Sequence, residues 1–340
     1  MKVTSQNAPP SASEIEKRDA APSTGMPPDK SREFDSSEHH ETLHFALMRL
    51  LLVCLALPAL LFTSSCVRSS TVVRVKKDGA GSIVARYYFS PETIAMIAQL
   101  EKLGGEFGAL GGAPGDGPQL GLLRDIANPD EESLIADGEN YGEGVRYATH
   151  QVDKDDNDWE GYTVVYEFDD IRKVRIDENS MPGNARAFVE SAGEGMKAGE
   201  GGSLTFELAE GTLTVKSTFA TKGMEGVIDE DQIDQAKKMG MAPSGMMKMA
   251  AGMTKGMRVG YFLRIDGGIA ETNAEHVTGD LITLNDADVE KVLLDPDLGE
   301  FIDKAAADPK AVTPEDFLAL IKKLEGMTVE TKDSITVKWK

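Results

Sequence analysis

The residues of this chain that are best spaced for metal chemistry lie near its N-terminus. His40-Glu41-Thr42-Leu43-His44 matches H-E-x-x-H, which on a helix places two imidazoles on one face for zinc, with the glutamate as general base. Here the motif lies in a segment rich in Ser, Pro and charged residues, which cannot bury enough apolar surface to fold. No third ligand is evident beside it. We therefore interpret the match as a chance one.

A second candidate for metal chemistry is the acidic turn 153–160. Asp153, Asp155 and Asn157 are spaced as in the first half of a calcium loop. The pattern then fails, because Asp158 replaces the glycine and Val164 replaces the final glutamate that such a loop requires. Hard cations need a fuller oxygen set, so we treat the three residues as weak candidates in a solvated hairpin tip and predict no metal.

Methionines form a third group. Four of them, Met246, Met249, Met253 and Met257, fall at helical spacing. Thioethers favour Cu(I), but no His or Cys lies nearby to complete such a site. A methionine surface can also adapt to an apolar partner or a lipid, or it can fill gaps in a core. We favour a core face packed against a sheet, with the adaptable binding face as the alternative. The full group is Met239, Met241, Met246, Met247, Met249, Met253 and Met257.

Cys66 follows a segment typical of export. Met48 and Arg49 precede an uncharged apolar run of 13 residues, 50–62, and then Thr63, Ser64 and Ser65. A spanning helix needs roughly 17–25 residues, so the run is better suited to a cleaved signal. Residues 60–66 resemble the lipobox of bacterial lipoproteins, although Thr63 stands where Leu is usual. The resemblance implies a diacylglycerol on the Cys66 sulfur, cleavage before Cys66 and acylation of the new amine. An ordinary secretory signal is the alternative.

The chain therefore divides into three parts. Residues 1–47 form a disordered extension, interpreted either as an artefact of the assigned translation start or as a cytoplasmic tail removed with the signal. Residues 48–65 form the signal peptide. Residues 66–340 form the mature β-rich domain, with a flexible glycine-rich loop over 104–121.

Charge and cysteine content limit the function of this mature domain. Of the formal net charge of −21, residues 1–65 contribute only −2. So acidic a surface repels nucleic acid, which we exclude as a partner. Cys54 lies inside the signal and Cys66 is the lipidation site, so no pair remains to form a disulfide.

The mature sequence alternates between strand and helix patterns and predicts an α+β fold, with a curved antiparallel sheet of hairpins packed by a few helices. Hairpins are expected at 71–77 with 82–89, 145–152 with 161–168 and 203–208 with 212–219. Further strands are expected at 171–176, 258–266, within 269–284, and at the two edge-like segments 327–331 and 335–339. Helices are expected at 91–102, from a start within 128–131 to 136, at 229–253 (kinked or divided at Gly240 and Pro243), 287–293 and 296–306, and at 317–324, where residues 313–316 form the cap.

The order of these elements resembles bacterial envelope lipoproteins with an LppM-like β-rich domain. The resemblance is carried by the hairpin 72–89, by Trp159-Glu160-Gly161-Tyr162 leading into Tyr166-Glu167-Phe168, and by residues 261–273. It implies an α+β fold with a curved antiparallel sheet and contains no catalytic motif.

No motif of the mature chain indicates an enzyme. There is no P-loop, nucleophile elbow or dinucleotide fingerprint, and the only histidines are His150 and His276. Our leading hypothesis is a lipid-anchored envelope protein, at the outer membrane or periplasmic face if the organism has two membranes. It needs no cofactor, has a non-catalytic binding or assembly role, and takes an apolar ligand or envelope protein in a groove near the methionine-rich helix. The alternatives are an envelope hydrolase that uses carboxylates and a purely structural component.

Overall fold

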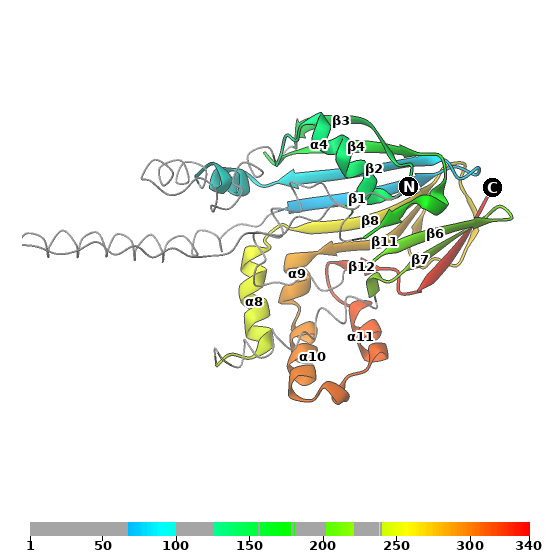
Figure 1. Cartoon of the computed structure of the whole chain (residues 1–340). Helices are drawn as coiled ribbons and strands as arrows, with labels where there is room; N and C mark the ends of the chain where they lie inside the picture. Colours follow the sequence, from blue (N-terminus) through cyan, green and yellow to red (C-terminus); the bar gives the residue numbers. More distant parts are fainter. Residues whose placement is uncertain are drawn as a thin grey trace, which may run out of the picture. The chain divides into compact units, whose positions relative to one another are not determined.

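The computed structural model describes residues 67–99, 126–155, 157–177, 180, 202–220, 238 and 240–340. The expectations for the extension, the signal peptide, Cys66 and the glycine-rich loop 104–121 all fall outside these residues. Thirteen strands are present in the described part, arranged in two sheets with helices beside them (Figure 1). This confirms the predicted α+β class. All three predicted hairpins form antiparallel strand pairs.

The larger sheet has eight strands in the order β10–β11–β8–β1–β2–β4–β3, with β12 paired to β11. Its centre joins segments that are far apart in the sequence, because β1 pairs antiparallel with β2 and parallel with β8. The bounds are β1 Val67–Val75, β2 Gly81–Phe89, β3 Arg146–Lys154, β4 Glu160–Phe168, β8 Arg258–Ile265, β10 Val277–Thr278, β11 Leu281–Asp288 and β12 Met327–Val329.

The first hairpin is closed by a turn that needs glycine. Gly79 has a φ of +91°, a conformation that L side chains rarely adopt, and its N–H donates to the Lys76 carbonyl at 3.0 Å. The Lys76 N–H donates in turn to the Ala80 carbonyl at 2.8 Å. The turn therefore fixes the register in which Val72 lies opposite Val84.

The smaller sheet has five strands in the order β5–β6–β7–β13–β9. The bounds are β5 Arg175–Ile176, β6 Leu204–Ala209, β7 Thr212–Ser217, β9 Ile269–Thr272 and β13 Ser334–Trp339. Two sequence predictions were wrong here. The segment predicted as a strand over 171–176 begins with a 3-10 turn, Ile171–Lys173, capped by the Asp170 side chain. The last segment is no edge strand, because β13 lies between β7 and β9 while β12 belongs to the other sheet.

The main core consists of side chains from both sheets. Val73, Ile83 and Leu263 of the larger sheet belong to the same buried cluster as Leu213 and Val337 of the smaller sheet. The helix α4, Glu131–Asp137, adds Leu134 to this cluster, and its N-cap is Asp130, which lies within the predicted helix start 128–131. The larger sheet therefore has an inner face that packs in this core and an outer face that does not.

A second cluster is formed by helices. Residues 243–253, 296–307 and 314–321 bring Met247, Ile302 and Phe317 together with Val329 of β12. Thr313 and Asp316 form the capping box expected before the last of these helices. Of the predicted helix 229–253, the structure describes α8 from Pro243 onward and Gly240 before it, where φ is +68°; residues 229–237 and 239 lie outside the described residues. The helix bounds are α8 Pro243–Met253, α9 Val289–Leu294, α10 Pro296–Ala307 and α11 Pro314–Ile321.

Candidate functional site

The outer face of the larger sheet carries an ordered row of polar side chains. Strand side chains alternate between faces, so residues in register on neighbouring strands stand side by side. Arg86 of β2 lies opposite Ser70 of β1, and Ser70 lies opposite Gly260 of β8. Two residues along each strand, and so on the same face, Arg68 of β1 neighbours Tyr88 and Arg258. Three arginines from three strands are thereby gathered on one face.

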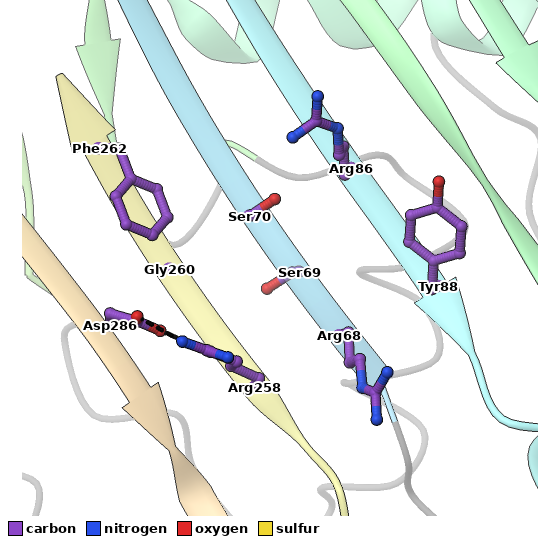
Figure 2. A pocket seen from close by; sticks show the side chains of 9 residues that line it. All are labelled: Arg68, Ser69, Ser70, Arg86, Tyr88, Arg258, Gly260, Phe262 and Asp286. Carbon is purple, nitrogen blue, oxygen red and sulfur yellow. Dashed lines mark hydrogen bonds and ion pairs between the residues drawn. The ribbon is translucent and has the colours of Figure 1, made fainter. Parts of the chain in front are cut away.

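A cavity opens on this face, with a volume of about 280 Å³. It lies across four neighbouring strands, and Figure 2 shows the side chains around it. Three guanidinium groups and one carboxylate are its charged groups, so its net charge is positive although the whole chain is strongly acidic. The lining residues are Arg68, Ser69, Ser70, Arg86, Tyr88, Arg258, Gly260, Phe262 and Asp286.

Arg258 is held by the carboxylate of the cavity. Its Nε and Nη2 donate to the two oxygens of Asp286 at 2.8 and 2.7 Å, a bidentate pair between β8 and β11 (Figure 2). These hydrogen bonds and the charge of Asp286 raise the pKa of Arg258 above its usual value. The pair fixes one wall of the cavity and neutralises one of its three positive charges.

Arg68 is held by three groups at the start of β1. Its guanidinium lies 3.9 Å from the ring centroid of Trp159, its Nη1 is 3.4 Å from Asp155 Oδ2, and its Nε donates to the Gly256 carbonyl at 3.4 Å. Partial burial opposes ionisation of Asp155, but the backbone N–H groups of Trp159 and Asn157 and the Arg68 charge keep its pKa below the usual value. Arg68 thus connects β1, the turn 155–159 and the start of β8.

Tyr88 closes the opposite side of the cavity. Its hydroxyl donates to Asp153 Oδ1 at 2.6 Å, across β4. Gly161 is in register with both Tyr88 and Asp153, and a Cβ on it would collide with the backbone of Tyr87 and Tyr88, so the close approach of β4 to β2 requires glycine here. Burial, followed by the bond to Asp153, raises the pKa of the Tyr88 hydroxyl. Tyr88 therefore presents its ring to the cavity while its hydroxyl is occupied.

The remaining donors of the cavity are uncommitted. Within the described residues, Arg86 makes no ion pair or hydrogen bond, and the same holds for the hydroxyls of Ser69 and Ser70. The cross-strand neighbours of Arg86 are Ser70 and Thr163, which carry no charge. Figure 2 shows the Ser70 hydroxyl directed toward the strand that carries Arg86. The cavity therefore combines two fixed arginines with one available guanidinium.

The weak metal candidates have other partners in the structure. Asp153 accepts from Tyr88, and Asp155 Oδ1 accepts the backbone N–H groups of Asn157 and Trp159 at 2.8 and 2.9 Å. The turn is thus closed by Asp155 itself. Among the described residues no group of three or more His, Cys, Asp or Glu side chains could hold a metal ion.

No methionine of the described residues lines the cavity. Met247 is buried in the helical cluster, whereas Met249 is 54% exposed. The prediction of one buried methionine face is wrong at Met249, whereas Met247 packs mainly with helix residues such as Ile302 and Phe317 and in one cluster with Val329 of β12. No part of the described chain forms a helix long and apolar enough to span a membrane.

The two histidines of the mature chain lie apart. The His150 Nδ1 is 2.7 Å from the Tyr147 hydroxyl, and the His276 Nε2 is 3.1 Å from the Val329 carbonyl. Neither belongs to the cavity. The residues that the sequence reasoning missed are Arg68, Arg86 and Arg258. The sequence around each arginine predicts only that its side chain points outward from a strand. Whether the three lie close together depends on the order of the strands in the sheet.

No protein-family model matches this sequence, and no curated protein matches it. Among solved structures, the chain is similar to the folded domain of LppM from Mycobacterium tuberculosis, determined by NMR. The match has a TM-score of 0.26 and 8% sequence identity, and it covers 65% of this chain and 82% of that chain. So low a TM-score does not establish a common fold. The resemblance found in the sequence stays a prediction, and the chemistry of the site depends on its own geometry.

Proposed function

We propose that this chain is a lipid-anchored protein of the cell envelope with a non-catalytic binding role, and that the outer-face cavity is its binding site. The observation that carries this proposal is the cavity of about 280 Å³ with the uncommitted guanidinium of Arg86 at its side. Ligand sites combine apolar walls with a few polar groups that fix orientation, and here Tyr88 and Phe262 supply the aromatic walls.

The position of the anchor supports the same proposal. Cys66 directly precedes Val67, the first residue of β1, and the cavity residue Arg68 follows it. A protein acylated at Cys66 carries two or three chains, which suffice for stable anchoring. The binding site would then be held close to the membrane surface by a central strand of the sheet.

The hydrolase alternative receives less support from this cavity. Glycosidic hydrolysis uses two carboxyl groups on opposite sides of the scissile bond. The cavity has one carboxylate, Asp286, and both of its oxygens accept hydrogen bonds from Arg258. A binding role needs no such pair.

The anchor is tested by the intact mass of the N-terminal peptide of protein extracted from native membranes. A peptide that begins at Cys66 and carries acyl chains is the expected result. An unmodified N-terminus upstream of Cys66 would contradict the anchor. In that case a Cys66→Ser variant should remain in the membrane fraction as the native chain does, because the thiol would play no part in attachment.

The binding role is tested by native mass spectrometry of the detergent-extracted protein. A small molecule that co-purifies with the wild type should be lost from Ser70→Phe, because the ring fills the cavity. Thr149→Phe is the matched control, since Thr149 is exposed on the outer face of β3 away from the cavity. Equal retention by both variants would place the ligand elsewhere.

A further inference from the structure

The cavity contains one positive charge that no acidic side chain of the described residues neutralises. Each acid around it already has a partner: Asp286 is paired with Arg258, Asp155 with Arg68, and Asp153 accepts from Tyr88. Arg86 stands between uncharged neighbours and makes no ion pair within the described residues. A guanidinium offers a planar set of donors that matches carboxylate and phosphate oxygens. The free charge therefore selects for an anion.

An aromatic ring covers the floor of the cavity on the side of Ser70 that is away from Arg86. Gly260 lies in register with Ser70, and a Cβ on it would be 2.5 Å from the Phe262 ring. The ring thus leans over the bare backbone of β8. A ligand oxygen placed near Arg86 would have the Ser70 hydroxyl on the adjacent strand as a second donor and an aromatic ring beyond it.

We propose that the cavity binds the oxyanion of a small amphipathic ligand, a carboxylate or a phosphate, on Arg86 and Ser70, with the apolar part of the ligand against Phe262 and Tyr88. This inference rests on the proposed binding function and names the ligand class. The volume of about 280 Å³ lies just below the range of small-molecule sites, which measure roughly 300–1,000 Å³. The site therefore takes an anionic group and a short apolar segment rather than a whole large molecule.

The roles of the other two arginines follow from their partners. Arg258 and Arg68 are fixed by Asp286, Asp155 and Trp159, so they shape the cavity and add positive potential. Arg86 is the only cavity arginine, within the described residues, whose donors are all available. Its removal should reduce anion binding most, and its replacement by lysine should keep the charge but lose the planar donor set.

The test uses the full-length protein purified from membranes in a neutral detergent, titrated calorimetrically with inorganic phosphate, acetate and octanoate. Octanoate should bind more tightly than acetate, because it adds an apolar chain to the same carboxylate. Arg86→Gln should weaken octanoate binding by roughly tenfold or more, the effect expected for loss of a hydrogen-bonded charge. Arg86→Lys should weaken it less.

The matched control is Arg74→Gln. Arg74 lies on the same face of β1 but outside the cavity, and its Nη2 pairs with Asp266 at 3.2 Å. The control should bind octanoate as the wild type does. An equal loss in Arg74→Gln and Arg86→Gln would overturn the proposal, because the effect would then reflect the general charge of the face.

Vesicles distinguish a free anion from a lipid headgroup as the source of the oxyanion. The probes are Cys66→Ser protein with vesicles of phosphatidylcholine alone or mixed with phosphatidylglycerol. Binding to the mixed vesicles that is lost in the double variant with Arg86→Gln supports a headgroup. Octanoate or phosphate binding without vesicle binding supports a soluble ligand.

Failure of the inference is separable from failure of the binding role. A co-purifying uncharged molecule that Ser70→Phe excludes but Arg86→Gln retains would overturn the oxyanion and leave the binding role. Absence of any co-purifying molecule, together with absence of octanoate, phosphate and vesicle binding, would overturn both.

Discussion

On β1 and β2 the inner face of the larger sheet presents Val73, Ile83 and Tyr87, which are nearly inaccessible to solvent. The outer face of the same strands presents Ser70 and Arg86, which remain half-buried or exposed. One alternating sequence therefore serves two purposes, since each inward residue adds to the core and each outward residue remains available for a ligand. Substitutions at neighbouring positions of one strand should therefore differ in their effect on the free energy of unfolding.

The largest expected difference is between two adjacent valines. Val73→Ala removes a side chain that is 1% exposed and should lower the free energy of unfolding by about 2–3 kcal/mol, because the buried methyl groups and their contacts are lost. Val72→Ala, on the outer face, should cost about 1 kcal/mol or less. Urea titration of both variants measures the contrast. Equal costs would mean that the outer face is covered as completely as the inner one.

Two tyrosines give the next contrast. The Tyr162 hydroxyl is buried without a hydrogen-bond partner among the described residues, so Tyr162→Phe should be neutral or stabilising by up to about 1 kcal/mol. Tyr88→Phe should cost about 1–1.5 kcal/mol, since it leaves Asp153 without its donor. Thermal and urea unfolding measure both. Destabilisation by Tyr162→Phe would instead indicate that its hydroxyl has a partner in solution.

A smaller contrast is expected along the outer face itself. Arg68→Gln should destabilise the protein by about 1 kcal/mol, because it removes the cation–π contact with Trp159 together with the ion pair. Arg74→Gln, which removes one half-exposed ion pair, should change stability by about 0.5 kcal/mol or less. If the two variants unfold at the same urea concentration, the contact with Trp159 contributes nothing measurable.

The smallest expected effect is a pH dependence. The pKa of Asp155 is lower in the folded protein than in the unfolded chain, so its contribution is present above its unfolded pKa of about 3.9 and is lost as the pH falls through the lower folded value. Asp155→Asn should therefore lose less stability than the wild type between about pH 5 and pH 3. Urea midpoints at the two pH values provide the comparison, and parallel losses would contradict it.

Local signals in the sequence predicted much of the fold. The hairpin 71–89 and the helix cap at Thr313 depend on residues close together in the chain, and the structure confirms them. The parallel pairing of β1 with β8 depends instead on which hydrophobic faces fit together across the molecule. The sheets to which β12 and β13 belong could not be predicted for the same reason: they follow each other in sequence but lie in different sheets.

The candidate site was less predictable than the fold. Arg68, Arg86 and Arg258 each occupy an outward position of a strand, where an arginine is usually solvated and carries no further information. Strand order alone brings them to one cavity. The acidic turn, by contrast, was evident in the sequence, but its carboxylates serve the turn, Tyr88 and Arg68.

The parallel contact between β1 and β8 also determines when the site can form. Arg68 and the carbonyl of Gly256 are 188 residues apart in the chain, and such non-local pairing is slow because a long loop must first close. During synthesis or export from the N-terminus, β1 and β2 can pair early, but one edge of β1 stays open until β8 arrives. That edge is a target for wrong pairing and aggregation in the interval. Since Arg258, Gly260 and Phe262 all arrive with β8, ligand binding becomes possible only after the most vulnerable stage of folding has passed.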